Sequence, residues 1–179
     1  GSLKGNKGDR IMADTSVVAV DLGAESGRVM EICFDGTRLT QTEIHRFQNV
    51  PVTVHNTLYW DVLRLWHEIQ NGIEAVGPRA ASIGVDSWGV DFALLDRQGT
   101  MLGNPVHYRD SRTDNMMEWV FERVPRRTVF ERTGLQFMQL NTLYQLASLV
   151  HSQSPLLDMA EAYITFPDLF NRWLCGSST

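Results

Sequence analysis

Three short polar segments carry the side chains that could bind a charged or hydroxyl-rich ligand. Residues 21–28 begin with Asp21, directly after the apolar run 17–20, and turn at Gly23 and Gly27. A carboxylate at a strand end can hold a hydrated metal ion, and glycines let backbone N–H groups close around phosphate oxygens. Ordinary hairpin turns use the same residue types. The segment alone therefore leaves a phosphate loop and a solvated turn as alternatives.

The other two segments have the composition of a sugar site. Residues 86–91 combine two carboxylates, an indole and a glycine, and residues 108–112 form a polar cluster without helical periodicity. A sugar needs bidentate partners for neighbouring hydroxyls and an aromatic surface for its apolar face. Trp88, Arg109 and Asp110 supply these types. Alternatively, Trp88 is a core aromatic residue, and the two charged residues form a solvated ion pair that contributes little.

Composition excludes several classes of function. The net charge of −5 offers no broad basic surface for nucleic acid or anionic membranes. No apolar run approaches the roughly 20 residues that span a bilayer. Cys33 and Cys175 lie far apart, without disulfide or metal spacing, which favours a reducing cytoplasm. We expect residues 1–14 to be a tag or linker without fixed structure, and residues 15–179 to form one domain.

Short strands followed by helices must position the three segments. Strands are predicted at 17–20, 28–34, 38–47, 81–85 and 90–95. Asp61 is expected to cap a helix that ends at Gly77. Asp91 lies in the last of these strands, either as a site carboxylate or as a buried structural acceptor. The second half is predicted to be helical, with helices at 114–124 and 126–132, a helix capped by Asn141 or Thr142, a short helix with Pro155 at its first position, and a last helix that begins with a capping box at Thr165.

The order of elements indicates a mixed α/β fold. Three strands joined by tight turns form an antiparallel meander, and the following helix crosses over to a parallel strand. This arrangement resembles the ribonuclease-H-like core of the superfamily that contains sugar kinases, hexokinase and actin.

Seven sequence segments make the resemblance specific. They resemble, in the same order, the N-terminal part of the rhamnulokinases in the FGGY family of carbohydrate kinases. The segments are DLGAESGRV, LTQTEIHRF, WDVLRLW, SIGVDSWGVDFALLD, GNPVHYRDSRT, RTGLQFMQLNTLYQL and FPDLFNRWLCG. The similarity runs from about Val17 to Gly176, nearly all of the chain outside the expected tag.

The resemblance implies ATP-dependent phosphorylation of L-rhamnulose at its 1-hydroxyl, with Mg²⁺ as the metal. It assigns the ATP phosphates to Ala24, Glu25, Ser26, Gly27 and Arg28, and it places Asp21 toward the hydrated magnesium ion. It assigns the sugar to Gly89, together with Trp88, Arg109 and Asp110. At Gly89, the absence of a side chain lets the ligand approach closely.

The resemblance also implies a partial domain. The family's general base belongs to a His-Asp-Thr segment downstream of Leu174, so no catalytic base is expected in this chain, and we expect the chain alone to be inactive. The alternatives are another FGGY kinase, acting on xylulose, fuculose or glycerol, and a non-catalytic sugar- or nucleotide-binding module. A domain without its last strands leaves a sheet edge uncovered, so self-association through that surface is expected.

Overall fold

The computed structural model describes residues 15–176, so the tag or linker predicted at 1–14 lies outside the described residues. Four strands form the main sheet: β1 (Thr15–Leu22), β2 (Ser26–Phe34), β3 (Leu39–Gln48) and β6 (Ala80–Ser87). Two small sheets are made of β4 (Val52–Val54) with β5 (Thr57–Tyr59), and of β7 (Phe92–Leu95) with β8 (Ala162–Thr165). The helices are α1 (Val62–Val76), the 3₁₀ turn η1 (Ser111–Thr113), α2 (Met116–Phe121), α3 (Arg126–Thr133), α4 (Thr142–His151), α5 (Leu156–Met159) and α6 (Phe166–Cys175).

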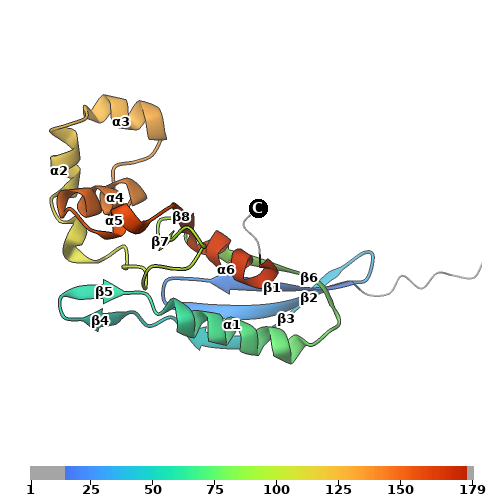
Figure 1. Ribbon diagram of the computed structural model, residues 1–179. Helices are drawn as coiled ribbons and strands as arrows, with labels where there is room; N and C mark the ends of the chain where they lie inside the picture. Colours follow the sequence, from blue (N-terminus) through green and yellow to red (C-terminus); the bar gives the residue numbers. More distant parts are fainter. Residues whose placement is uncertain (1–14, 177–179) are drawn as a thin grey trace, which may run out of the picture.

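The main sheet confirms the predicted meander and crossover. Its order is β3-β2-β1-β6, with β1 antiparallel to β2, β2 antiparallel to β3, and β1 parallel to β6 (Figure 1). Helix α1 makes the connection from the meander to β6, as a parallel pair requires. In the described part of the chain, β6 pairs only with β1, and its outer edge has no strand partner.

One face of the sheet carries the main core. Alternate residues of β1 point into it, including Val18 and Val20, because side chains alternate across a strand. Helices α1 and α6 cover that face with Ile69 and Phe170, which are fully buried. The predicted cap of α1 is confirmed, since the side chain of Asp61 accepts a hydrogen bond from the N–H of Arg64 at 3.1 Å.

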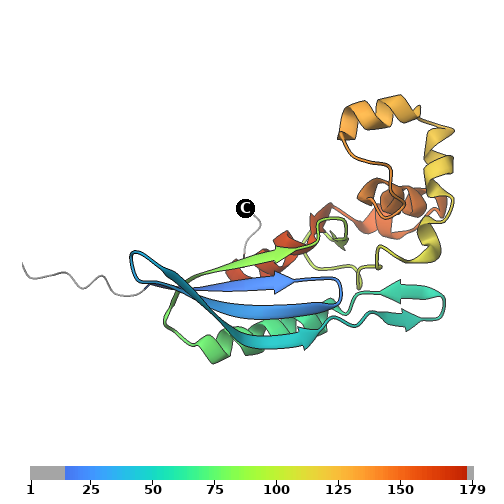
Figure 2. The same cartoon turned by 180° about the vertical axis from the view of Figure 1, so that it is seen from behind.

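Helices α2 to α5 and the β4–β5 hairpin lie beyond one end of the sheet (Figures 1 and 2). Helices α2 to α5 form a separate helical arm, and the β4–β5 hairpin projects from the sheet beside it (Figure 2). The sequence predicted a loop where β4 and β5 form, and it did not predict β8. These strands have only three or four residues each, too few for a period to be visible, and their pairing decides their structure.

The buried side of α4 differs from the apolar stripe in its sequence. Leu143, Leu146, Ala147 and Val150 share one stripe at helical spacing, yet Leu143 and Val150 are exposed. Gln145 and Ser148 are buried instead. Burial of Gln145 is tolerated because its side-chain amide makes several hydrogen bonds.

A carboxylate near the far end of the sheet should contribute to the acid stability of the chain. Hydrogen bonds from Arg79 and from the hydroxyl of Ser16 lower the pKa of Glu31 from its ordinary 4.5 to about 2. Because the folded pKa is the lower one, this stabilisation is complete above pH 4.5 and is lost as the pH falls toward 2.

We therefore expect Glu31→Gln to unfold at a lower temperature at pH 7 and to lose less stability than the wild type between pH 5 and pH 2. Circular dichroism melts across this range measure the difference. The control is Glu74→Gln, which removes an exposed carboxylate from α1 that has no ion pair in residues 15–176. An unchanged acid slope in Glu31→Gln would contradict the prediction.

Candidate functional site: a turn and a corner at one end of the sheet

The candidate phosphate loop is the tight turn between β1 and β2. The N–H of Gly23 donates to the carbonyl of Ser26 at 2.9 Å, which closes the turn. The N–H groups of Ala24 and Glu25 donate to no residue in the described part of the chain, so they remain available to a ligand. Two adjacent free N–H groups in a turn form a small anion-binding concavity.

Gly27 is required by packing. A Cβ at this position would lie 2.4 Å from the ring of Phe47, which is buried against the turn. The glycine therefore allows β3 to lie close beneath the loop.

Asn49 supports the turn from below, and sequence reasoning missed it. Its side-chain amide donates to the carbonyl of Gly23 at 3.0 Å, and its backbone N–H donates to the carbonyl of Glu25 at 2.9 Å. Asn49 is buried at the end of β3, where the sequence predicted only the start of a loop. A buried Asn directly after a strand is the signal that could have identified it.

Removing this support should weaken the turn. Asn49→Ala removes the hydrogen bond to the carbonyl of Gly23, a net loss of about 0.5–1.5 kcal/mol. Urea unfolding should show a loss of that size. Asn71→Ala, on the exposed side of α1, should change stability by only a few tenths of a kcal/mol. Equal effects of the two substitutions would show that Asn49 does not hold the loop.

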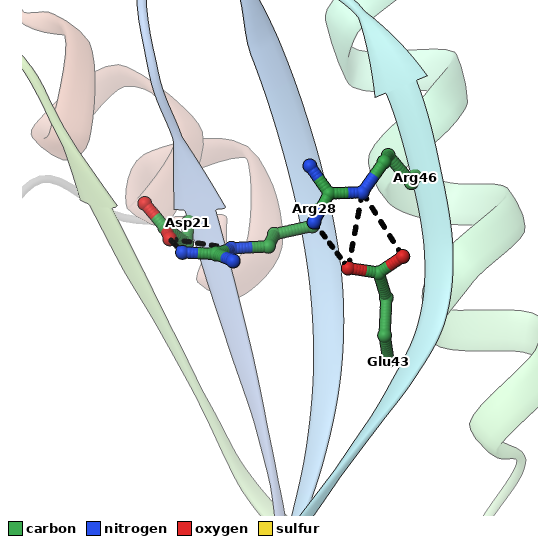
Figure 3. A network of polar contacts seen from close by, with 4 residues as sticks. All are labelled: Asp21, Arg28, Glu43 and Arg46. Atoms are coloured by element: carbon green, nitrogen blue, oxygen red, sulfur yellow. Dashed lines mark hydrogen bonds and ion pairs between the residues drawn. The ribbon is translucent and has the colours of Figure 1, made fainter.

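Charged side chains from three strands lie in a row beside this turn. Asp21 on β1 pairs with Arg28 on β2 at 2.6 Å, and Arg46 on β3 pairs with Glu43 (Figure 3). Asp21 and Arg28 are partners in the strand register, and so are Arg28 and Arg46, so the row crosses the sheet on one face. Arg28 is thus already neutralised, and a phosphate would have to share it with Asp21.

The second candidate segment leaves the sheet next to the first. Leu22, which precedes the turn, is the register partner of Ser87, which precedes Trp88 and Gly89. Because β1 and β6 are parallel, both chain segments leave the sheet at the same end. The structure therefore brings the candidate phosphate turn and the Trp88–Gly89 corner together.

The corner is held by a buried carboxylate. Asp91 is fully buried, and its side chain accepts hydrogen bonds from the indole N–H of Trp60 at 2.6 Å, the indole N–H of Trp88 at 2.8 Å and the amide of Gln145 at 3.0 Å. Burial raises the pKa of Asp91, and the three donors act in the opposite direction. Asp91 thus fixes the ring of Trp88, which lies 4.4 Å from the ring of Trp60 between centroids.

Gln145 connects the corner to the helical arm. Its amide nitrogen also donates to the carbonyls of Val90 and Leu140, and its oxygen accepts from the guanidinium of Arg112 at 2.8 Å. One side chain of α4 therefore joins the corner to the third candidate segment. Sequence reasoning did not single out Gln145; a polar residue amid an apolar helix was the available signal.

The third segment, residues 108–112, is anchored by the β5 strand. Asp110 is buried, and its carboxylate accepts from the N–H of Leu58 at 2.7 Å and from the N–H of Arg112 at 2.9 Å. Arg109 is exposed, with its guanidinium carbon 5.4 Å from the centre of the Tyr108 ring. The structure thus leaves Arg109 accessible and uses Asp110 to hold the backbone.

A neutral histidine lies under this segment. His107 stacks on Trp60 with ring centroids 3.9 Å apart, and its Nδ1 accepts from the N–H of Arg109 at 2.9 Å. Burial and the charge of Arg109 lower its pKa to about 4, so the ring is uncharged at neutral pH. A neutral ring can accept that hydrogen bond and stack without the cost of burying a charge.

Comparison with known proteins identifies the family. Residues 16–179 match the N-terminal domain of the FGGY family of carbohydrate kinases. The chain belongs to this family, which confirms the family predicted from sequence.

The sequence relatives are more specific than the family. The chain is 45% identical over 171 residues to a protein named rhamnulokinase from Pectobacterium atrosepticum, covering 93% of the chain and 34% of that protein. It is 40% identical over 162 residues to the rhamnulokinase of Oceanobacillus iheyensis, covering 89% of the chain and 34% of that protein. The chain therefore spans about a third of the length of these relatives.

Solved structures support the fold. A gluconate kinase from Lactobacillus acidophilus superposes with a TM-score of 0.77 at 13% identity, over 93% of this chain and 34% of that one. A xylulose kinase from the same organism superposes with a TM-score of 0.77 at 14% identity, over 92% of this chain and 34% of that one. At such identities the likeness concerns the fold alone, and it confirms the prediction of a ribonuclease-H-like domain of mixed α/β structure.

No helix in residues 15–176 is both long enough and apolar enough to cross a membrane. The same residues contain no group of three or more histidine, cysteine or acidic side chains placed to hold a metal ion.

Proposed function

We propose that the protein to which this chain belongs transfers a phosphoryl group from ATP to the 1-hydroxyl of L-rhamnulose. The proposal rests on the pairing of Leu22 with Ser87 in the strand register. This pairing supports a phosphate site at the turn beside a sugar site at the Trp88–Gly89 corner. Phosphoryl transfer depends on positioning the two reactants and on stabilising charge. The relatives named rhamnulokinase, at 40–46% identity, favour L-rhamnulose over xylulose, fuculose or glycerol.

In this proposal the ATP phosphates bind at residues 24–28, with the free N–H groups of Ala24 and Glu25 and the charge of Arg28. The sugar binds at Gly89 and Trp88, with Arg109 at the rim and Asp110 holding the segment that carries it. The general base comes from residues outside this chain, so the chain binds without catalysing. We propose that the protein acts in the cytoplasm, where the reaction would use cytoplasmic ATP.

The side chains near the turn would hold a divalent metal ion through water molecules and not by direct coordination. Asp21 is half-exposed and paired with Arg28, and the residues 15–176 supply no further cluster of metal ligands. A hydrated Mg²⁺ held by Asp21 through water, together with phosphate oxygens, is consistent with this set. Such an ion would neutralise phosphate charge, while Arg28 and the turn orient the phosphates.

The experiment compares ligands on the chain itself. Thermal-shift and calorimetric titrations should show binding of L-rhamnulose and weaker or no binding of L-fuculose, D-xylulose and glycerol. A coupled assay with Mg-ATP and L-rhamnulose should show no ADP formation above background. Preference for another sugar would overturn the substrate assignment. Turnover by the pure chain would overturn the claim that the base lies elsewhere.

We also propose that a second copy of the chain pairs along the open edge of β6. The outer edge of β3 is protected by charged side chains, including Glu43 and Arg46, whereas β6 carries no charge before Asp86 and exposes Ile83. Uncharged, unpaired strand edges favour edge-to-edge association. A concavity lined by Ile83, Tyr163 and Leu174 adjoins this edge.

Sedimentation should therefore show concentration-dependent dimers. Ile83→Lys places a charge at the interface and should raise the dissociation constant at least tenfold, about 1.4 kcal/mol. Leu39→Lys, on the opposite edge of the sheet, should leave it unchanged. A clean monomer at the highest concentration would contradict the proposal.

A further inference from the structure

A small apolar cavity opens beside Gly89, between the corner and the helical arm. It has a volume of about 280 Å³ and is lined by Gly89, Val90, Val129, Thr133, Leu135, Phe137 and residues 141–144. Ligand pockets usually measure roughly 300–1,000 Å³, so this cavity suits part of a sugar better than a nucleotide.

Apolar side chains make up most of the lining, and three polar side chains around the cavity already donate to backbone carbonyls. Thr133 donates to the carbonyl of Val129 at 2.9 Å, Asn141 to that of Gln136 at 2.8 Å, and Thr142 to that of Val90 at 2.7 Å. One hydrogen on each of these three side chains is therefore already used. A hydroxyl placed against the apolar lining would lose its water for few partners, whereas a methyl group there would lose none.

Two parts of the chain form the walls, and hydrogen bonds fix them to each other. Thr142 and Gln145 on α4 both bind the carbonyl of Val90, next to Gly89. Tyr144, fully buried in the core of the helical arm, supports the α4 side. The cavity is therefore formed before any ligand arrives, which reduces the entropic cost of binding.

We infer that this cavity receives the methyl end of a 6-deoxyketohexose and so selects deoxy sugars over fully hydroxylated ones. The inference rests on the proposed function, since the sugar must bind at Gly89 for its far end to reach the cavity. L-Rhamnulose carries a C6 methyl group where L-fructose carries a hydroxymethyl group, and the two sugars have the same configuration. Only L-fructose can close a pyranose ring through its C6 hydroxyl, so the methyl contact is decided by the saturation pattern together with the affinities. Exchanging one small group in an apolar pocket changes affinity by roughly tenfold or more.

Saturation-transfer NMR on the 179-residue chain tests the contact directly. Irradiation of the aromatic protons of the protein, far from the sugar signals, should saturate the C6 methyl of L-rhamnulose at least about twice as strongly as its C3 and C4 protons. Competition should give L-fructose a dissociation constant roughly tenfold higher than that of L-rhamnulose.

A matched pair of variants tests the wall of the cavity. Leu135 is 59% exposed, so Leu135→Ser should fold normally; it should reduce the methyl saturation relative to the C3 and C4 signals. Leu39→Ser, 67% exposed on β3, should leave the pattern unchanged. Melting curves verify that both variants fold.

The outcomes separate the cavity from the proposed function. Equal saturation of all sugar protons, with equal affinities for L-rhamnulose and L-fructose, would overturn the methyl contact and leave the ketose site in place. The absence of saturation at every sugar proton would overturn both.

Discussion

Gly89→Ala should lower the affinity for L-rhamnulose by about 5- to 150-fold while leaving the fold intact, since overpacking a close contact costs roughly 1–3 kcal/mol. A Cβ at Gly89 would meet no atom of the chain within 4 Å, and its φ lies outside the left-handed region. Neither packing nor backbone conformation therefore requires glycine here. If the small residue serves a ligand, the penalty appears only when the ligand binds.

Stability should move in the opposite direction. Replacing an unstrained glycine with alanine restricts the unfolded chain and stabilises the protein by about 0.4–1 kcal/mol. Calorimetric titration and a melting curve on the same sample measure both effects. Gly103→Ala is the control, because a Cβ there also meets no atom within 4 Å. It should show the small stabilisation and unchanged sugar binding.

Normal sugar binding by Gly89→Ala would show that the sugar does not touch this position. Gly27→Ala gives the contrasting case, since its Cβ would lie 2.4 Å from Phe47 and the fold itself should suffer.

Asp91→Ala should lower the free energy of unfolding by about 3–5 kcal/mol, because it leaves several buried donors without an acceptor, at about 1–3 kcal/mol each. The substitution leaves the indoles of Trp60 and Trp88 and the amide of Gln145 without their acceptor, at a fully buried position. Small domains are stable by about 5–15 kcal/mol, so this loss takes a large share. Urea unfolding followed by far-ultraviolet circular dichroism measures it.

A second variant at the same position separates charge from hydrogen bonding. Asp91→Asn keeps one oxygen, the acceptor shared by the two indoles, but turns an N–H₂ group toward the donor of Gln145. We expect it to cost about 1–3 kcal/mol, less than alanine. Asp158→Ala, at an exposed position on α5, should lie within about 0.5 kcal/mol of the wild type. An Asp91→Ala variant as stable as this control would show that the network contributes nothing.

The long strands and the crossover helix could be predicted because their own residues encode them. Strand β1 is continuously apolar over residues 17–20, and α1 repeats its apolar residues at helical spacing between Asp61 and Gly77. Strand β8 could not be predicted, because four residues show no period and its partner β7 lies about seventy residues earlier in the chain. Only the folded topology brings those two together.

The candidate site was predicted as segments, and two of its supports, Asn49 and Gln145, were not. Asp21, the turn at 24–28 and the Trp88–Gly89 corner were named from residue types, and their shared end of the sheet follows from the parallel pairing. Asn49 and Gln145 act through hydrogen bonds between distant segments, which spacing along one segment does not reveal. The roles of all these residues toward ATP and sugar remain predictions.

The paired positions of Leu22 and Ser87 have a consequence for how such proteins diversify. Backbone hydrogen bonds between two core strands hold the starting points of the two candidate segments at roughly the strand spacing of 4.7–4.9 Å. Residues after Ser87 can then be exchanged to suit a new acceptor molecule without retuning the distance to the donor. The strand pairing keeps this distance constant, and the residues after Ser87 are the part that evolution, or an engineer, can change.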